Sequence, residues 1–295
     1  MNLTIMSMVE PYNPVSLMKK TISFIAVAAV VVFSSCSKSE TQISALNTLS
    51  ADAQIENGTK TVYSDNGAGA GMKVDWAESE SFLAYHEGSS EPVTFSKSAA
   101  GTKFSATDVP EGITASTPFK GLYGSAATLN SAGKISVDFS AQNGTLENIA
   151  SYDIMTADSE LKDNVLTFAF KHKCAILRVK IQNKYTEADE RVKKLVLEFE
   201  NAAIDASFAE GCIYERPYGN YYDLSFPVEV APQETKTYYI AVPAMKFEKT
   251  NYSGIPMSQP GTVRKCITLW EKYRPAIEAG KVYDISLIYQ TVQPD

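Results

Sequence analysis

Apolar and polar side chains alternate at every second position along much of the chain. Residues 175–182 read AILRVKIQ, so that Ala, Leu, Val and Ile share one face while Arg, Lys and Gln lie mostly on the other. Because successive side chains of a β-strand point to opposite faces, this period of two predicts a strand with one buried face. The same period recurs at 166–170, 195–199, 222–230, 263–269 and 283–289, and in shorter runs at 72–76, 82–85, 93–95, 103–106, 135–139 and 152–155.

Turn-forming pairs separate these runs, at Asn57-Gly58, Asn66-Gly67, Glu111-Gly112, Asn143-Gly144 and Ala279-Gly280. A helical period is rare, and its one candidate is 270–279, which Pro275 interrupts. Many short strands joined by turns are typical of antiparallel sheets that pack face to face. The sequence therefore predicts an all-β protein made of antiparallel β-sandwiches.

The first 35 residues have a different pattern, which is that of a secretory signal. Met18 is the expected start, because two lysines follow it and a short apolar run then extends from Ile22 to Phe33. This run is shorter than the roughly 20 residues that a membrane-spanning helix needs. Two serines precede Cys36, and this ending resembles the lipobox of bacterial lipoproteins. We therefore expect residues 1–35 to be removed and Cys36 to be acylated; a plain secreted protein cleaved nearby is the alternative.

The length that remains after the signal suggests two domains. About 260 residues follow position 35, and domains commonly contain about 100–200 residues. Residues 36–59 are mostly small and polar, which predicts a flexible tether. A second polar stretch, 157–164, separates the earlier strand runs from the later ones. We therefore expect an N-terminal sandwich at 60–160 and a C-terminal sandwich at 161–295.

Charge and histidine content argue against several classes of function. The chain has 27 Lys and Arg against 34 Asp and Glu, and a net charge of −7 offers no electrostatic attraction for nucleic acid. Its two histidines, His86 and His172, lie outside any recognisable catalytic or metal motif, and a packed structural role is expected for His172. Glu78, Glu80 and Glu87 could supply the paired carboxylates of a glycosidase, although surface acids explain them more simply. We expect no cofactor, no metal and no enzymatic activity.

Three cysteines follow Cys36, at Cys174, Cys212 and Cys266, far apart and without a C-x-x-C pair. This spacing gives no support for a zinc site or a redox motif. Buried free thiols are the expected state, and one disulfide among the three is the alternative.

One segment combines aromatic and charged side chains. Residues 214–222 read YERPYGNYY and contain Tyr214, Arg216, Tyr218, Tyr221 and Tyr222. Tyr and Arg are favoured at contact surfaces, so this segment is a candidate platform for a sugar or another protein. The alternative is that Tyr222 opens the next strand and that the other residues cover a sheet edge.

Four segments together resemble a known family. They are the signal that ends at Cys36; Lys60–Tyr63 followed after a glycine-rich stretch by Val74–Trp76 and a strand at 81–85; the run from Leu166 through Ile181; and Ile277–Ile285. They are similar to the fimbrillin family, the type V pilins and fimbrillin-like surface lipoproteins of Gram-negative anaerobes. The resemblance implies two transthyretin-like antiparallel β-sandwich domains in tandem and export as a lipidated precursor. One departure is that residues 77–80 read AESE, where the family often has a Gly-Asp pair.

The family resemblance also implies assembly by β-strand exchange. In that mechanism a protease removes the N-terminal strand of one subunit, and a strand from a neighbour fills the groove and pairs with the open sheet edge. Shaft subunits of the family are commonly cut at an arginine, but here no arginine precedes Arg178, which lies inside a predicted strand. Lys60 is the candidate processing site, and Lys38 is the other basic residue nearby. We therefore favour an uncut, lipid-bound base or stand-alone subunit.

These observations predict a non-enzymatic outer-membrane lipoprotein of the cell surface, which is a fimbrial subunit or a fimbria-associated adhesin. Its expected partners are other fimbrial subunits, the outer membrane through the lipid anchor, and a host or microbial surface protein or glycan. A glycan-binding lipoprotein of a nutrient-uptake system is the alternative, and a glycosidase comes third. Aromatic side chains gathered in one cleft would favour the glycan binder.

Overall fold

The computed structural model describes residues 47–56, 76, 79–89, 91–98, 101–188, 190–200, 202–217, 221–247, 254–257, 265–268 and 276–289. Within these ranges nearly all regular structure is β-strand, which confirms the all-β prediction. The described helices are a single 3-10 turn, η1 (Phe139–Ala141), and one short α-helix, α1 (Leu146–Tyr152), whose N-cap Thr145 accepts a hydrogen bond from the Asn148 amide. No described helix is long and apolar enough to cross a membrane.

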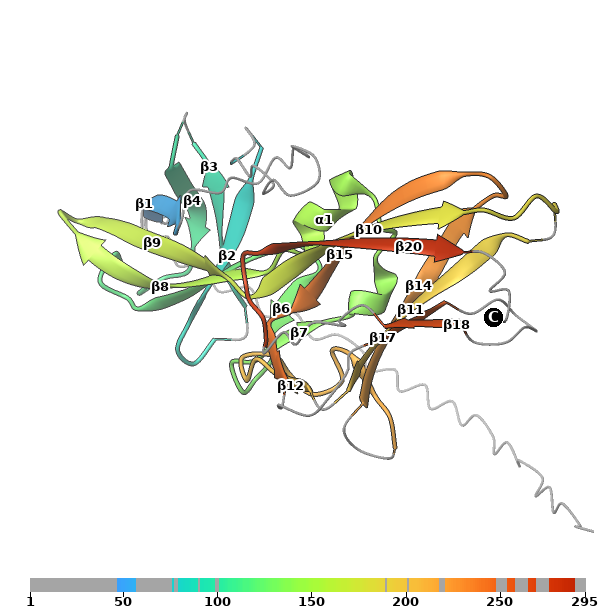
Figure 1. The fold of residues 1–295 in the computed structure, drawn as a ribbon. Coiled ribbons are helices and arrows are strands. Elements are labelled where there is room, and N and C mark those ends of the chain that lie inside the picture. Colours follow the sequence, from blue (N-terminus) through green and yellow to red (C-terminus); the bar gives the residue numbers. More distant parts are fainter. Residues whose placement is uncertain are drawn as a thin grey trace, which may run out of the picture. The chain divides into compact units, whose positions relative to one another are not determined.

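Seven strands form a sheet that closes on itself, in the order β1-β4-β3-β2-β5-β8-β9 (Figure 1). They are β1 (Asn47–Ile55), β2 (Ser81–His86), β3 (Val93–Lys97), β4 (Lys103–Val109), β5 (Phe119–Tyr123), β8 (Met155–Lys162) and β9 (Val165–His172). Neighbouring strands pair antiparallel except at one seam, where β1 runs parallel to β9 and closes the sheet. Alternation of buried and exposed positions, as in β3, turns one face of each strand inward.

The interior of this closed sheet is rich in aromatic rings. Phe82 stacks on Phe95 at a centroid distance of 5.1 Å, and it meets Phe168 edge to face at 4.9 Å. Trp76 packs edge-on against Phe104 at 5.2 Å. Such offset and edge-to-face pairs contribute about 0.5–1.5 kcal/mol each beyond the area they bury. Aromatic packing therefore fixes this first core.

The remaining strands form four smaller sheets, of which the central one has the order β15-β10-β20 (Figure 1). β10 (Cys174–Asn183) pairs antiparallel with β15 (Thr235–Pro243) and parallel with β20 (Val282–Tyr289). A second sheet has the order β13-β14-β11-β17-β18, and its strands are Tyr214–Glu215, Tyr221–Val230, Val192–Glu200, Gly254–Met257 and Lys265–Thr268. The others are β12-β16-β19 (Ala202–Ile204, Met245–Phe247, Ala276–Ile277) and β6-β7 (Ala127–Leu129, Ile135–Val137).

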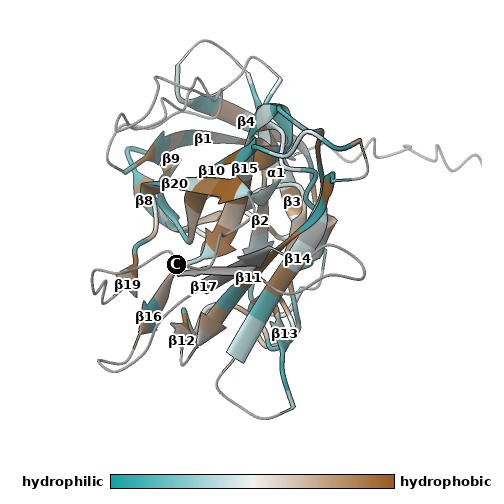
Figure 2. Cartoon of the chain, turned by 45° about the vertical axis from the view of Figure 1, so that its right-hand side comes forward, coloured by the Kyte–Doolittle hydropathy of each residue, from teal (hydrophilic) through white to brown (hydrophobic). Residues whose placement is uncertain are grey.

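A second hydrophobic core lies among these sheets. β10 contributes much of it, with Leu177, Val179 and Ile181 almost completely buried, and its apolar residues appear brown in Figure 2. Phe139 and Ile149, which precede β10 in the sequence, belong to the same core. The second core therefore includes residues from the part of the chain that was expected to form the first sandwich.

The polar stretch 157–164 is not a linker. Most of it belongs to β8, and Asp163 and Asn164 form the turn into β9, both with positive φ. β8 and β9 pair along their length, from Met155↔His172 to Lys162↔Val165. Polar side chains are tolerated here because alternate positions of this hairpin face solvent. The expected boundary between 160 and 161 thus falls inside a hairpin, and the division into two tandem transthyretin-like domains stays a prediction.

The tether expectation for 36–59 is wrong for residues 47–55, which form β1. Leu49, Ala51 and Ala53 are buried in the first core, while the residues between them are more exposed. Alanine is depleted in strands, and two alanines among Ser, Asp and Gln weaken the alternating pattern that would reveal a strand. The rest of the tether and the signal lie outside the described residues.

Candidate functional site

β1 lies between two strands that are distant from it in the sequence. Leu49 to Asp52 pair antiparallel with residues 103–106 of β4, and Ala51 to Ile55 pair parallel with residues 166–170 of β9. Leu49, Ala51 and Ala53 are 6%, 1% and 0% exposed. β1 therefore fills a slot between two strands that do not pair with each other in the observed strand order.

An ion pair between Asp52 of β1 and Lys103 of β4 also joins these two strands on their outer face. Lys103 Nζ donates to Asp52 Oδ2 at 2.7 Å. Burial raises the pKa of the Asp52 carboxyl, but hydrogen bonds from Lys103 and Thr102 together with the Lys103 charge outweigh it, so the net pKa is lowered. The lysine side chain is more than half exposed, so this pair adds little to the stability of β1.

The predicted processing and lipidation residues flank β1 in the sequence. Cys36 precedes Asn47, and Lys60 follows Ile55, so a cut at Lys60 would separate β1 from the remainder of the closed sheet. Cys36, Lys38 and Lys60 themselves lie outside the described residues. The structure therefore shows that a strand, β1, lies between Cys36 and Lys60 in the sequence. The roles of these two residues stay predictions.

The structure brings some residues of the tyrosine-rich segment together. Arg216 donates from Nε to Asp223 at 2.6 Å and from Nη2 to Glu198, and its guanidinium lies 5.2 Å from the centre of the Tyr221 ring. The two acids raise the pKa of Arg216, chiefly through the hydrogen bond to Asp223. The arginine is thus held by the sheet, and it positions the Tyr221 ring through a cation–π contact.

The other tyrosines of this segment have separate environments. Tyr214 is 63% exposed, whereas Tyr222 is half-buried and packs against the second core. Tyr218 lies outside the described residues. The structure therefore combines both expectations for the segment: Tyr222 belongs to a strand that packs inward, and Tyr214 remains on the surface. A role in ligand binding stays a prediction.

Cys174, Cys212 and His172 are packed against other residues in the described part of the chain. Cys174 and Cys212 are free, buried thiols, as expected, and burial raises the pKa of Cys174 well above its ordinary value. The side chain of Cys266 lies outside the described residues. His172 Nδ1 is 2.9 Å from Asp153 Oδ1 at the end of α1, which fits the packed role expected for it. No group of three or more His, Cys, Asp or Glu side chains among the described residues could hold a metal ion.

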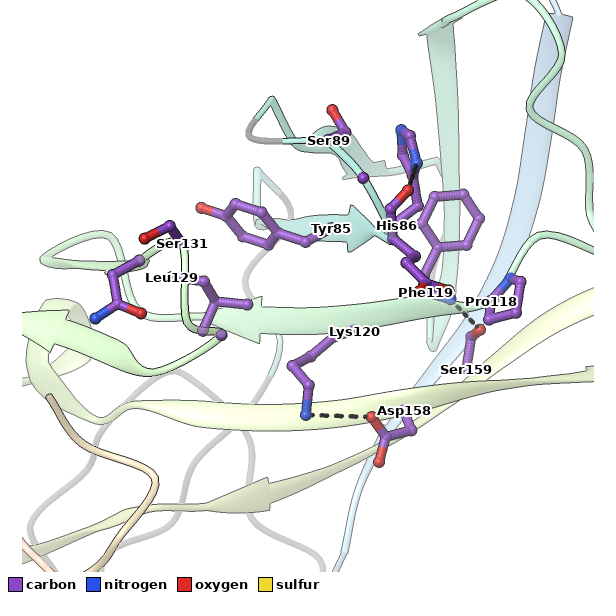
Figure 3. A pocket seen from close by; sticks show the side chains of 14 residues that line it. Tyr85, His86, Ser89, Pro118, Phe119, Lys120, Leu129, Ser131, Asp158 and Ser159 are labelled. Atoms are coloured by element: carbon purple, nitrogen blue, oxygen red, sulfur yellow. Dashed lines mark hydrogen bonds and ion pairs between the residues drawn. The ribbon is translucent and has the colours of Figure 1, made fainter.

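Sequence reasoning missed an open pocket of about 650 Å³ that described residues line (Figure 3). Tyr85 and His86 at the end of β2, Lys120 on β5 and Asp158 on β8 line it, together with the turn between β6 and β7. The sequence placed His86 outside any recognisable catalytic or metal motif, and it gave no sign that this residue would line a pocket. Tyr85 was part of a predicted strand, but nothing in the local pattern showed that a distant turn would enclose its ring.

Comparisons with known proteins found similarity at the level of structure. No protein-family model matches the chain, and no curated protein matches it significantly. A candidate cell adhesion protein from Bacteroides uniformis is 16% identical, with a TM-score of 0.46 and coverage of 82% of this chain and 92% of that chain. The fimbrial anchor protein Mfa2 from Porphyromonas gingivalis is 12% identical, with a TM-score of 0.37 and coverage of 82% and 91%.

A fimbrial protein from Bacteroides ovatus is 11% identical, with a TM-score of 0.34, and the match covers 83% of this chain and 51% of that chain. These three structural neighbours are described as fimbrial or cell adhesion proteins.

Proposed function

We propose that this chain is a non-enzymatic lipoprotein of the cell surface that serves as a fimbrial subunit or a fimbria-associated adhesin. The lipobox-like ending at Cys36 supports a lipid anchor in the outer membrane, and two acyl chains suffice for stable anchoring. The observation that carries the assembly part of the proposal is the seat of β1 between β4 and β9.

The slot under β1 has the properties that strand exchange requires. Without β1, the backbone groups of β4 and β9 that face it would lose their partners, and Phe104, Leu166 and Phe168 would lose cover. Among the described side chains of β1, the buried ones are one leucine and two alanines, and their burial stabilises the strand in its slot by roughly 3–4 kcal/mol. A strand from another subunit could match this contribution and restore the same backbone hydrogen bonds, which is the physical basis of β-augmentation.

Within this proposal we favour a base or stand-alone subunit in which β1 stays attached. Arg178, the first arginine of the chain, is 4% exposed in the middle of β10, and Asp284 of β20 accepts from its Nε and Nη2 at 2.5 and 2.9 Å. An arginine-specific protease has no access to a buried residue in a paired strand. Lys60 remains the candidate site for a protease of different specificity.

A disulfide lock between β1 and β4 distinguishes the two modes of assembly. Asp52 and Lys103 are directly opposed in the register, at the spacing that a disulfide can bridge. Cells that produce the double variant Asp52→Cys/Lys103→Cys should be compared with cells that produce the wild type, and their purified surface appendages analysed for this chain. If the chain is a base subunit, we expect it in the appendages of both, because an uncut subunit keeps β1 in place.

If the lock excludes the chain from appendages and a reductant restores it, β1 leaves its slot during assembly and the subunit is processed. Absence of the wild-type chain from the appendages would contradict the role of a base subunit and favour the stand-alone subunit. Labelling with a fatty-acid analogue tests the anchor separately: Cys36→Ala should abolish the label, and equal labelling of both forms would exclude lipidation at Cys36.

A further inference from the structure

The pocket in Figure 3 has one aromatic wall. Tyr85 lies on the outer face of β2, and its ring extends across the hollow towards Leu129 and Ser131 in the segment that joins β6 and β7. The ring is half-buried and packs against the second core, which fixes its orientation. Within the described part of the chain, its hydroxyl makes no hydrogen bond. This wall therefore offers a ligand the Tyr85 ring in a fixed orientation, together with the Tyr85 hydroxyl as a hydrogen-bonding group.

The other wall of the pocket carries an exposed ion pair. Lys120 and Asp158 are opposed across β5 and β8, and their charged atoms are 3.4 Å apart. Their side chains are 49% and 84% exposed, so the pair is weak and most of its hydrogen-bonding capacity remains available to a ligand. This wall therefore offers a donor and an acceptor next to each other.

The turn after β6 adds a donor whose position is fixed. Asn130 Oδ1 accepts hydrogen bonds from the backbone amides of Ala132 and Lys134 at 2.9 and 3.0 Å. Because the oxygen is used in this way, the amide nitrogen of Asn130 is the group left for other contacts at the pocket rim.

The charge balance of the pocket limits the class of ligand. Lys120 is offset by Asp158, and Glu87 is a second acid in the lining, so a phosphate or nucleotide would find no concentrated positive charge. A purely apolar ligand would leave the charged and amide groups without partners, which is costly. A ligand that fits must have one apolar face for the ring and several hydroxyl groups that donate and accept along its edge.

We propose that this pocket binds a neutral glycan, with a sugar ring on the face of Tyr85 and its hydroxyl groups on Lys120, Asp158 and Asn130. The volume of about 650 Å³ lies in the range of small-molecule sites and suits one or two sugar rings. The inference goes beyond the proposed role in assembly and does not depend on it, because β1 takes no part in the pocket. It gives the adhesin a ligand class.

Saturation-transfer NMR on the full chain without its signal tests this inference, with lactose, maltose, cellobiose and N,N′-diacetylchitobiose as probes. We expect at least one of them to bind the wild type. Tyr85→Ala should weaken that binding roughly tenfold, which is the size of one lost aromatic contact. Lys120→Ala should weaken it as well, and because this side chain is half exposed in a weak ion pair, we expect little loss of stability. Tyr214→Ala tests the tyrosine-rich segment as the rival site. The matched control is Lys162→Ala, which removes an exposed lysine from another surface ion pair outside the pocket lining and should leave binding unchanged.

Three results would overturn the proposal. The first is that none of the four disaccharides binds. The second is that binding survives both Tyr85→Ala and Lys120→Ala. The third is that Tyr214→Ala abolishes binding while Tyr85→Ala retains it, which would move the glycan site to the tyrosine-rich segment.

Discussion

Replacing Leu49 by alanine should loosen β1 while leaving the second core intact. Leu49 is 6% exposed, belongs to the first core and is opposite Ala106 of β4. The change removes three carbon atoms, which at about 0.8 kcal/mol per buried CH2 costs about 2.4 kcal/mol of transfer free energy. Leu→Ala changes in protein cores cost about 2–5 kcal/mol once a cavity is included. Because Leu49 lies near the start of β1, where the strand can relax, we expect about 2.5 kcal/mol.

Hydrogen exchange read by mass spectrometry measures this effect locally. If β1 opens as a unit, a loss of about 2.5 kcal/mol in its opening free energy raises the exchange rates of its amides roughly 60-fold. Peptides from β4 and β9 should follow, because their amides pair with β1, whereas peptides from β10 and β15 should change little. Leu161→Ala is the control: its side chain is 47% exposed, so the change should stay within about 0.5 kcal/mol.

Two results would contradict the claim that β1 opens on its own and that Leu49 helps to hold it. An equal rise of exchange in β10 and β15 would show that both cores unfold as one unit, so that β1 cannot open independently. Unchanged exchange in β1 would show that its apolar side chains do not hold it in the slot.

Two further predictions concern buried polar pairs. Asp284→Ala removes the carboxylate that accepts from two nitrogens of the buried Arg178 guanidinium, and urea denaturation should show a loss of about 3 kcal/mol in the free energy of unfolding. Glu229→Ala, at an exposed ion pair, is the control and should lose less than about 0.5 kcal/mol. Equal losses for the two variants would contradict a buried role for the Arg178–Asp284 pair. Burial lowers the pKa of His172, but its hydrogen bond to Asp153 and the charge of that carboxylate outweigh burial, so the net pKa is raised above 6.5. The stabilisation of the fold by protonated His172 is therefore fully present below pH 6.5 and is lost as pH rises through the raised pKa. The difference in the free energy of unfolding between wild type and His172→Gln should become smaller across that pH range. A difference that grows would contradict the pairing of His172 with Asp153.

The strand period predicted those parts of the fold that local sequence determines. Residues 175–181 were expected to form a strand with one apolar face, and β10 occupies them, although its first six residues are buried on both faces, including Arg178, which pairs with Asp284. The parallel pairing of β1 with β9 was not predictable, since a period of two says nothing about which strands become neighbours. Small side chains and intervening polar residues also hid β1 itself.

At the candidate sites, too, the sequence showed which residues are present but not which distant residues they contact. The tyrosine-rich segment was visible as a composition, but the ion pairs of Arg216 with Glu198 and Asp223 depend on strand pairing that composition does not reveal. The pocket beside Tyr85 depends on the β6–β7 turn and on β8, which are distant in sequence from β2. Sequence patterns identify the residue types available, whereas the tertiary arrangement decides which of them meet.

The N-terminus of the protein extracted from the cell surface shows whether the chain is an uncut, lipid-anchored subunit. Mass spectrometry of that terminus should find Cys36 as the first residue, carrying acyl chains, with β1 still part of the chain. A first residue at Thr61 would instead mean that a cut at Lys60 removes β1 and opens its slot. An unlipidated terminus inside a described strand, such as β1 or β2, would contradict the account of an anchored surface subunit.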